Sequence, residues 1–524
     1  MNYRNKQSRH WVNWLSTKQS GLMNNNIYHI FEQHFPVTRE DIFLETPSGE
    51  TYSYATLERE VARLAHFLAD LGLNKGERVA VQVEKSPQAL FLYLACLRAG
   101  LIYLPLNTAY TENELDYFLE NAEPNLVVCD PTSQDMFARL AANHQVQHLY
   151  TLGADGTGSL SQAGAQRVAE FSTIACDKDD VAVILYTSGT TGRPKGAMIT
   201  HGNLAANGLA LQQTWHWQQQ DVLLHALPIF HIHGLFVACH SVLLGGSKML
   251  FVPRFDVQVI MKLLPRATVM MGVPTFYTRL LEQADFDQAM CQHMRLFISG
   301  SAPLLEQTFE EFQQRTGHTI LERYGMTETG MNTSNPVEGA RLAGTVGLPL
   351  PGVEARIVDE HNQPVSGDNV GMLQVRGENV FKGYWRMPVK TAEEFTEDGF
   401  FITGDLAKYN PEGYISIVGR NKDMVITGGY NVYPKEIELL LDELDGVKES
   451  AVIGLPHKDF GEAVTAVIVP EDIQHPPDEK AIIAQLKQKL ANYKVPKSII
   501  ILDQLPRNTM GKVQKNTLRE KYGQ

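Results

Sequence analysis

The stretch with the clearest chemistry runs from Tyr186 to Gly196 and reads YTSGTTGRPKG. Its hydroxyls, its backbone N–H groups and the Lys195 ammonium are suited to surround a polyphosphate. Gly189, Gly192 and Gly196 allow φ > 0 and a close approach of the backbone to a ligand. The common phosphate-binding loop has Ser or Thr directly after Gly-Lys, whereas Gly196 follows Lys195 here. The stretch therefore predicts a phosphate-binding loop of another kind, with a plain surface loop as the alternative.

The flanking sequence predicts how this loop is held. Residues 181–185 form a short apolar run typical of a buried strand, and residues 203–215 carry apolar side chains at helical spacing. Helices alternate with short apolar strands from about residue 31 to 176, and this rhythm continues over 222–300. Such alternation indicates doubly wound, mainly parallel sheets with helices on both faces, an α/β fold whose ligands bind beyond the carboxyl ends of the strands.

The second half of the chain predicts two further units. From about residue 346 short alternating strands with turns indicate a β-rich subdomain, which ends near residue 421. Beyond it, strands and helices spanning roughly a hundred residues indicate a separate α+β domain. We therefore expect an N-terminal extension at 1–27, a large domain at 28–421 and a small C-terminal domain at 422–524.

The composition limits the function classes. The 524 residues carry a formal net charge of −13, which opposes the binding of nucleic acid and of anionic membranes. An anionic ligand must therefore be held by local positive charge. Five scattered cysteines without a CxxC pair indicate reduced thiols and give no zinc signature. The longest apolar stretch, 89–106, is interrupted by Arg98, Gly100 and Pro105, so we expect no membrane span.

The N-terminus leaves two interpretations open. Residues 1–28 contain Arg4, Lys6, Arg9 and Lys18 but no acidic residue. A basic start without acidic residues fits a mitochondrial presequence, and an extra tail is the alternative. We expect a cytoplasmic protein, or one of the mitochondrial matrix if residues 1–27 are a presequence.

Further motifs follow the loop along the chain. They are YGMTET at 324–329, TGD at 403–405, GRNKD at 419–423 and PRNTMGK at 506–512. Together with the loop, they resemble the acyl-CoA synthetases of the acyl-adenylate-forming superfamily, and the likeness extends from about residue 28 to residue 521. Within that superfamily the resemblance is to malonyl-CoA synthetases, through VPTFYTR at 273–279, MNTSNP at 331–336 and FKGYWRMP at 381–388.

The resemblance implies an ATP- and CoA-dependent ligase for malonate that works in two half-reactions. A carboxylate attacks the α-phosphorus of ATP to give an acyl-adenylate and pyrophosphate, and the CoA thiol then displaces AMP. Placement and charge neutralisation are the protein's main tasks in such chemistry. The implied ATP and AMP contacts are Thr187, Ser188, Gly189, Thr190, Thr191, Gly192, Lys195, Ser301, Ala302, Tyr324, Thr327, Asp405, Arg420 and Lys512.

The resemblance also assigns particular roles around the nucleotide. Glu328 is the implied Mg²⁺ ligand, since one carboxylate together with phosphate oxygens suits this hard cation. Thr327 would reach the α-phosphate. Asp405 would accept hydrogen bonds from both ribose hydroxyls, with Arg420 at the same ribose. The implied adenine contacts are Tyr324 and the turn at 300–303. The residues implied to act in catalysis are Lys512, Lys195, His231 and Thr327.

The C-terminal domain is implied to move between the half-reactions. Lys512 would bridge the substrate carboxylate and the α-phosphate during adenylation, where an ammonium group stabilises developing negative charge. Lys422 lies at the implied hinge, and Gly428 and Gly429 follow in a loop expected to face CoA. Without the motif in front of it, Lys512 would be interpreted as ordinary solvated surface.

The acyl pocket is implied to contain histidines and a cation. A second carboxylate one methylene from the reacting one needs a cation or several donors once it is desolvated. Arg279 is the predicted cation, with Arg254 and Arg295 as the next candidates. His231 would act as a gate beside the reacting carboxylate. His231 and His233 have no evident third ligand nearby in the sequence, so they do not indicate a metal site. A structural role is the alternative for Arg279 and for His233. The predicted acyl contacts are Arg279, His233, Ile232, Ser301 and Met331.

Other functions stay open at this point. The same motifs fit a ligase for another short-chain or aromatic acid, a carrier-protein loading enzyme, or an oxygenase of the luciferase type that shares the first half-reaction. A non-catalytic nucleotide-binding homologue would be expected to have lost Lys195, Glu328, Asp405 or Lys512, and all four are present. We expect a monomer or a homodimer that binds ATP, Mg²⁺, CoA and malonate.

Overall fold

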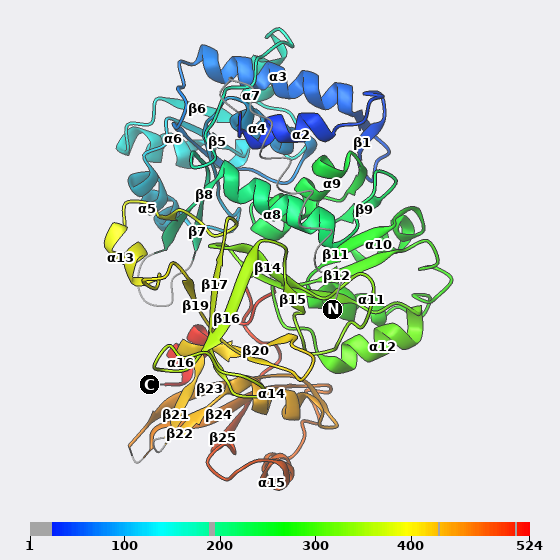
Figure 1. The fold of residues 1–524 in the computed structure, drawn as a ribbon, viewed down its shortest axis with the longest axis vertical. Helices are drawn as coiled ribbons and strands as arrows, with labels where there is room; N and C mark the ends of the chain where they lie inside the picture. The colour runs from blue at the N-terminus through cyan, green and yellow to red at the C-terminus, as the bar shows by residue number, and fades with distance from the viewer. Residues whose placement is uncertain (1–23, 188–193, 428–429, 459, 509–510, 524) are drawn as a thin grey trace, which may run out of the picture.

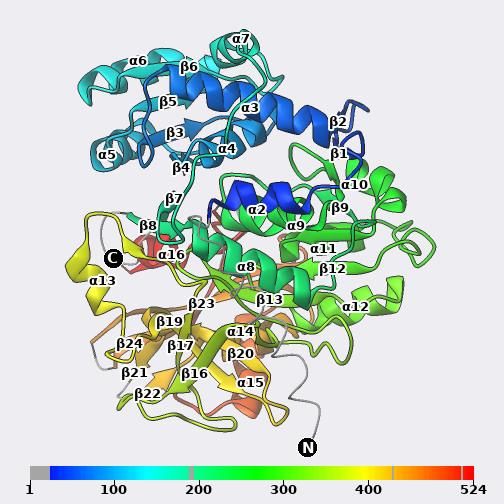
Figure 2. The ribbon, with the colours of Figure 1, turned by 45° about the horizontal axis from the view of Figure 1, so that its top comes forward.

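Two large sheets form the upper part of the protein, and two smaller ones lie below them (Figures 1 and 2). The computed structural model describes residues 24–187, 194–427, 430–458, 460–508 and 511–523. Strands and helices alternate through the first large part of the chain, as the sequence predicts. The α/β fold class is therefore confirmed.

The first large sheet has seven strands, and its central strands pair in parallel. Val79 and Val81 pack against α3 and α4 on one face, whereas Ala80 packs against α5 and α6 on the other. This alternation follows from the two-residue period of a strand. In sheet order the strands are β18 (Gly383–Tyr384), β8 (Lys195–Thr200), β7 (Val181–Thr187), β4 (Ile102–Pro105), β3 (Arg78–Gln82), β5 (Leu126–Cys129) and β6 (His148–Thr151). The helices are α3 (Tyr54–Asp70), α4 (Pro87–Arg98), α5 (Glu112–Ala122), α6 (Gln134–Asn143) and α7 (Ser159–Ala165).

The second large sheet has nine strands and carries the predicted acyl and adenine residues at its edge. Its strands pair in parallel from β13 to β1, with antiparallel strands at both sides. In sheet order they are β15 (Leu348–Pro349), β14 (Gly330–Ser334), β13 (Leu321–Met326), β12 (Leu296–Ser299), β11 (Val269–Gly272), β9 (Val222–His225), β10 (Lys248–Phe251), β1 (Ile42–Glu45) and β2 (Thr51–Ser53). The helices are α8 (His201–Thr214), η2 (His233–Cys239), α9 (His240–Gly245), α10 (Val257–Leu263), α11 (Pro274–Leu281) and α12 (Glu306–Thr316).

Capping residues explain where the predicted helices begin. α4 starts at Pro87, whose fixed φ suits the first helical position, and Ser86 Oγ accepts a hydrogen bond from Ala89 N at 3.2 Å. α11 and α14 also begin with proline, at Pro274 and Pro434. A proline at the first helical position and a serine cap before it thus set where α4 begins.

The predicted phosphate loop joins two antiparallel strands, which corrects the expected order of strand, loop and helix. β7 pairs with β8 in a register that includes Thr187 and Lys195, and α8 begins only after β8. Gly196 lies inside β8 and has no left-handed backbone. A Cβ atom at this position would lie 2.9 Å from Ile184 Cγ2. Close packing, rather than a positive φ, therefore requires this glycine.

The N-terminal helix α2 (Ile27–His34) links the two large sheets. It packs against α4 of the first sheet and against α8 and α9 of the second. Asn26 Nδ2 donates to the Leu97 carbonyl at 2.7 Å, and Ile27 N donates to His201 Nδ1 at 3.1 Å. Packing of the chain therefore begins a few residues before the boundary predicted at residue 28.

The lower part of Figure 1 contains the predicted β-rich subdomain and the C-terminal unit. The subdomain is an antiparallel sheet of β16 (Val353–Val358), β17 (Gly371–Gly377), β19 (Phe401–Tyr409) and β20 (Ile415–Arg420), with α13 (Pro388–Glu393) between β17 and β19 in the chain. The C-terminal unit contains β21 (Val425–Thr427), β22 (Tyr430–Val432), β23 (Val447–His457), β24 (Gly461–Pro470), β25 (Ser498–Ile501), α14 (Pro434–Asp442), α15 (Glu479–Lys489) and α16 (Lys515–Tyr522). Across the described ranges, no helix is both long and apolar enough to cross a membrane.

Candidate active site

The predicted ribose and adenine residues meet where β13, β19 and β20 come together. Tyr324 Oη donates a short hydrogen bond to Asp405, and Arg420 Nε donates to the other oxygen of the same carboxylate at 2.6 Å. Asp405 and Arg420 face each other across the β19–β20 pair. Both oxygens of the buried Asp405 carboxylate are therefore engaged. Each oxygen keeps a second lone pair, so the carboxylate can still accept hydrogen bonds from a diol.

Glu328, the predicted Mg²⁺ ligand, is buried directly after β13. Tyr384 Oη donates to Glu328 Oε1 at 3.0 Å, and Lys195 Nζ lies 4.1 Å from the centroid of the same tyrosine ring. Lys195 also forms an ion pair with Glu394 at 3.3 Å. Burial raises the pKa of Glu328, because the carboxylate loses solvation. A cation bound beside Glu328 would offset that cost.

The chemistry of these donors fits Mg²⁺ better than a metal held by protein alone. Within the described ranges, no group of three His, Cys, Asp or Glu side chains is placed to hold a metal ion. Mg²⁺ in nucleotide sites uses one or two carboxylates together with phosphate oxygens. The single buried carboxylate of Glu328 is consistent with that arrangement.

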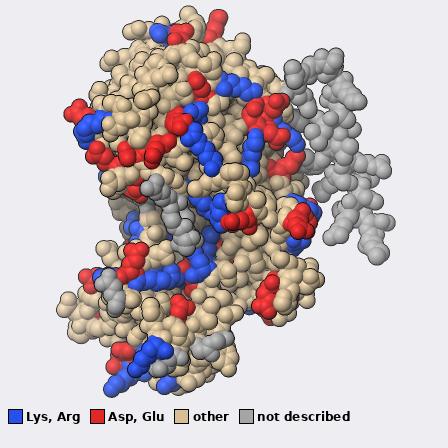
Figure 3. Space-filling model, turned by 90° about the vertical axis from the view of Figure 1, so that its left-hand side faces the viewer, with Lys and Arg blue, Asp and Glu red and all other residues tan. Residues whose placement is uncertain are grey.

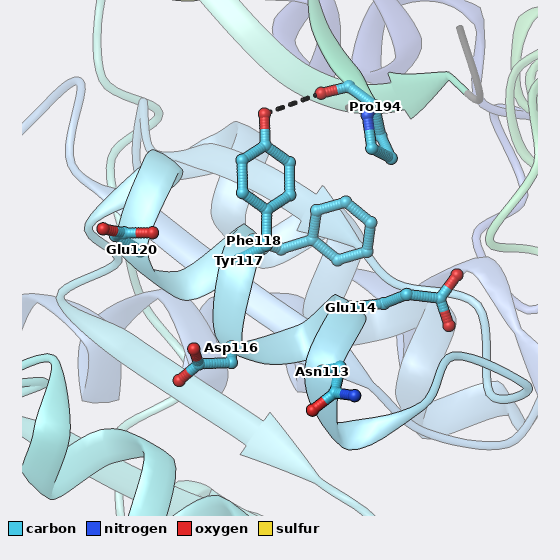
Figure 4. A pocket seen from close by; sticks show the side chains of 7 residues that line it. All are labelled: Asn113, Glu114, Asp116, Tyr117, Phe118, Glu120 and Pro194. Atoms are coloured by element: carbon cyan, nitrogen blue, oxygen red, sulfur yellow. Dashed lines mark hydrogen bonds between the residues drawn. The ribbon is translucent and has the colours of Figure 1, made fainter. Parts of the chain in front are cut away.

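The two ends of the predicted phosphate loop are tied to α5. Tyr117 Oη donates to the Pro194 carbonyl at 2.9 Å, as Figure 4 shows. At the other end, Tyr186 Oη donates to Asn121 Oδ1 at 2.6 Å. The positions between these ends lie outside the described residues, so the phosphate contacts expected there stay predictions. They are Ser188, Gly189, Thr190, Thr191 and Gly192.

Lys512 reaches this site from the C-terminal unit. Lys512 keeps solvent exposure, but partial desolvation by the surrounding protein lowers the pKa of its ammonium group, and the Arg420 charge lowers it further. Lys512 in turn is one of the charges that lower the pKa of His231. Figure 3 shows Lys and Arg side chains gathered at the waist between the upper and lower parts of the molecule. This local positive charge suits a polyanionic ligand despite the negative net charge.

The residue predicted as a hinge lies between the two parts. Lys422 is in the short helix η4 (Asn421–Asp423), directly after β20. Asp423 is bonded to Arg519 Nη2 of α16 at 2.6 Å. Gly428 and Gly429, the predicted CoA contacts, lie outside the described residues.

His231 and His233 lie in the turn that follows β9. His233 is buried, and its Nδ1 atom lies 3.2 Å from Ser301 Oγ. Burial lowers the pKa of His231 to about 4 and that of His233 well below its ordinary value, and the Arg323 charge lowers both further. Both imidazoles are therefore neutral at pH 7. His233 Nε2 is buried without a hydrogen-bond partner among the described residues.

Arg323 belongs to this cluster, and the sequence analysis missed it. Its side chain is buried on β13, and its Nε and Nη2 atoms have no hydrogen-bond partner in the described part of the chain. A Cβ atom at Gly300 would overlap the guanidinium, which therefore lies against the turn that carries Ser301. Burial lowers the pKa of Arg323 to about 9, so the group stays a cation at pH 7. A buried cation without a partner indicates an anion-binding site.

The turn after β12 is held in a conformation that is rare for a side-chain-bearing residue. Ser301 has φ = 70°, in the left-handed region that non-glycine residues seldom adopt. Behind the neighbouring Ala302, Leu304 N donates to Glu322 Oε2 at 3.3 Å. Burial raises the pKa of Glu322 to about 8. The left-handed backbone of Ser301 is strained, and backbone strain of this kind is typical of functional sites.

The cations predicted from the sequence lie elsewhere. Arg279 is exposed in the last turn of α11, and Arg254 is exposed after β10. Arg295 is paired with Asp221 at 2.6 Å. The predicted apolar neighbours Ile232 and Met331 are buried, as a pocket wall requires. Arg323 is thus a buried candidate for the cation of the acyl pocket, and the assignment of Arg279 stays a prediction. The sequence signal of Arg323 was a basic residue inside an apolar strand, directly before the YGMTET motif.

Known proteins resemble this chain over most of its length. A family model described as AMP-binding enzyme matches residues 31–385, and one described as AMP-binding enzyme C-terminal domain matches residues 436–512. A malonate–CoA ligase of Arabidopsis thaliana is 35% identical over an alignment that covers 97% of this chain and 90% of that protein.

Solved structures agree in both fold and domain arrangement. ATP-bound MatB from Rhodopseudomonas palustris matches with a TM-score of 0.93 and 55% identity, covering 96% of this chain and 99% of that chain. The apo structure of MatB from the same organism matches over the same shares with a TM-score of 0.82. The arrangement described here is therefore more similar to the ATP-bound structure than to the apo structure.

Proposed function

Because the chain belongs to the AMP-binding enzyme family, we propose that it is an AMP-forming acid–CoA ligase whose acid substrate is malonate. The observation that supports the choice of acid is the buried guanidinium of Arg323, whose Nε and Nη2 atoms have no hydrogen-bond partner among the described residues. A pocket for a fatty or aromatic acid has no use for a buried cation, whereas malonate keeps a second carboxylate after the first has reacted.

In this proposal the second carboxylate of malonate lies between Arg323 and His233. A guanidinium presents paired N–H donors that match a carboxylate. The proposal assigns Ser301 Oγ as donor to His233 Nδ1, which places the proton of the neutral imidazole on Nε2, the atom without a partner among the described residues. One cation and one neutral donor then meet the anionic group. Ile232 and Met331 limit bulk at the central carbon.

The reacting carboxylate lies beside His231 and attacks the α-phosphorus of ATP. The new P–O bond forms as the bond to pyrophosphate breaks, and pyrophosphate leaves with the electron pair. Lys512, Lys195 and Thr327 stabilise the negative charge of the phosphoryl oxygens. Glu328 would hold Mg²⁺, which neutralises phosphate charge when bound. In the second half-reaction the CoA thiol loses its proton and attacks the acyl carbon, and AMP leaves.

The proposal predicts a strict preference among carboxylic acids. Malonate should support rapid pyrophosphate release from ATP, and added CoA should convert the adenylate to malonyl-CoA. Acetate is the matched control, because it offers the same reacting carboxylate without the second one. Equal activity with acetate and malonate would contradict the assignment, and a preference for benzoate would support the alternative, a CoA ligase for another short-chain or aromatic acid.

We also propose that Lys422 is the hinge between a large domain, 28–421, and a mobile domain, 422–524. Lys422→Pro fixes φ near −65° at this position and so restricts rotation of the domain. Adenylation should continue, because the described arrangement already brings Lys512 to the site. Thioester formation should slow, since it requires the domain to rotate. Single-turnover release of pyrophosphate and of malonyl-CoA measures the two steps separately.

The control for the hinge variant is Lys422→Ala, which removes the charge but leaves the backbone free to rotate. Its thioester formation should match that of the wild type. Unchanged CoA-dependent turnover in Lys422→Pro would rule out the hinge position.

A further inference from the structure

A buried lysine holds the turn that carries His231 and His233. Lys85 lies between β3 and α4, and its Nζ atom donates 2.9 Å hydrogen bonds to the carbonyls of His225 and Leu227. A third contact joins Lys85 Nζ to His225 Nδ1 at 3.2 Å. Three acceptors match the three N–H donors that Lys85 carries when it is protonated, and burial lowers the pKa of Lys85 to about 7. Lys85 therefore holds the residues just before the turn in place. It does so from the segment that follows β3 of the seven-stranded sheet, whereas the turn follows β9 of the nine-stranded sheet.

His225 extends this contact to the residue at which the turn ends. Because Lys85 donates to Nδ1, the ring carries its proton on Nε2, and that proton is donated to the Gly234 carbonyl at 2.9 Å. Cys239 Sγ donates to the same carbonyl at 3.2 Å. Burial lowers the pKa of His225 well below its ordinary value, and the nearby Lys85 lowers it further, so the imidazole is neutral.

The backbone at Gly234 is unusual as well as tightly packed. Gly234 belongs to η2, a π-helix, and such wide turns often mark functional sites. A Cβ atom at Gly234 would overlap the Pro228 carbonyl, so the chain closes on itself between these two residues. The segment from 228 to 234 is thus a closed turn, and Lys85 and His225 hold both of its ends.

We propose that Lys85 is a positioning residue for the acid substrate, acting through His225 and Gly234 to hold His231 and His233 in the acyl pocket. The inference rests on the proposed ligase function, but it does not depend on which acid is used. Lys85 itself bonds to backbone and to His225, and it has no contact with the reacting atoms. Its removal should therefore change how well the acid is held and leave the nucleotide site unchanged.

Lys85→Met tests this role, because methionine keeps the apolar body of the side chain and removes all three donors. We expect kcat/KM for malonate in pyrophosphate release to fall about tenfold, the lower end of the range for loss of a residue that orients a ligand-binding side chain. The KM for ATP should stay unchanged, and so should thioester formation from supplied malonyl-adenylate. Lys85→Gln retains two N–H donors and should recover part of the loss.

The matched control is Tyr93→Phe. It removes one buried hydrogen bond in the same core, from Tyr93 Oη to His240 Nε2 at 2.8 Å, without touching the turn ends. An equal loss of malonate kcat/KM in Tyr93→Phe, at an equally lowered thermal midpoint, would show that Lys85 matters only for stability. A parallel rise of the KM for ATP in Lys85→Met would also overturn the inference. If Lys85→Met does not fold, Lys85→Gln is compared with Tyr93→Phe in the same way.

The double variant Lys85→Met/His225→Leu adds a second criterion. If the two residues act as one unit, the double variant loses no more activity than the larger of the single losses. Fully additive losses would show that Lys85 does not act through His225. The wild-type enzyme is also measured with the panel of acids, which tests the proposed function independently of the Lys85 variants. A wild type that activates another acid would overturn malonate as the substrate, and the Lys85 variants would then be measured with that acid.

Discussion

Replacement of Lys512 by alanine should nearly stop adenylate formation while thioester formation from supplied malonyl-adenylate continues. The Lys512 ammonium group is the contribution that our proposal assigns to the C-terminal unit in adenylation, where it stabilises charge that develops on the phosphoryl oxygens. Loss of one such group typically lowers the rate by about 10²–10³. Malonate-dependent pyrophosphate release measures the first step, and consumption of supplied malonyl-adenylate with CoA measures the second.

Lys515→Ala is the control for this variant. Lys515 lies in the same unit, but its Nζ atom is paired with Glu438 at 2.5 Å, so its charge is already neutralised by a protein partner. Both half-reactions should therefore continue in Lys515→Ala. An equal loss of both steps in Lys512→Ala would contradict the role assigned to Lys512.

Arg323→Met should lower kcat/KM for malonate by at least a hundredfold and leave the KM for ATP nearly unchanged. Removing one partner of a desolvated charge pair typically costs about 3–5 kcal/mol, which corresponds to about a hundredfold or more. The same variant should raise the thermal midpoint of the ligand-free protein, because it replaces a buried cation whose Nε and Nη2 atoms have no partner in the part of the chain that the structure describes. A gain in stability together with a loss of malonate activity is the signature of a substrate-binding charge.

Arg279→Met is the control, since Arg279 is exposed on α11 and was the cation predicted from the sequence. Its kinetics with malonate should match the wild type. If Arg323→Met still prefers malonate to acetate, the second carboxylate must be held elsewhere. If Arg279→Met alone loses that preference, the original prediction is restored.

The order of the secondary-structure elements was predictable from the sequence because it depends on local patterns. The apolar run at 126–129 and the proline at 87 mark β5 and α4 without knowledge of the rest of the chain. The predicted phosphate loop shows where such reasoning ends. Apolar periodicity after Gly196 identified α8, but it did not separate the short strand β8 from the loop, since β8 is defined by its pairing with β7.

The sequence by itself determined the fold class, the order of the motifs and the kind of chemistry, because residue type and spacing along the chain carry that information. Only the tertiary structure showed that Arg323 is a buried candidate for the cation of the acyl pocket, whereas Arg279 is exposed. Arg279 and Arg323 are both arginines near a strand end, and burial alone separates them. The sequence did not reveal the contact of Lys85 with His225 either. The two residues are 140 positions apart, and they belong to the layers of different sheets. Charges far apart in sequence acquire a role only when folding removes them from water and brings them together.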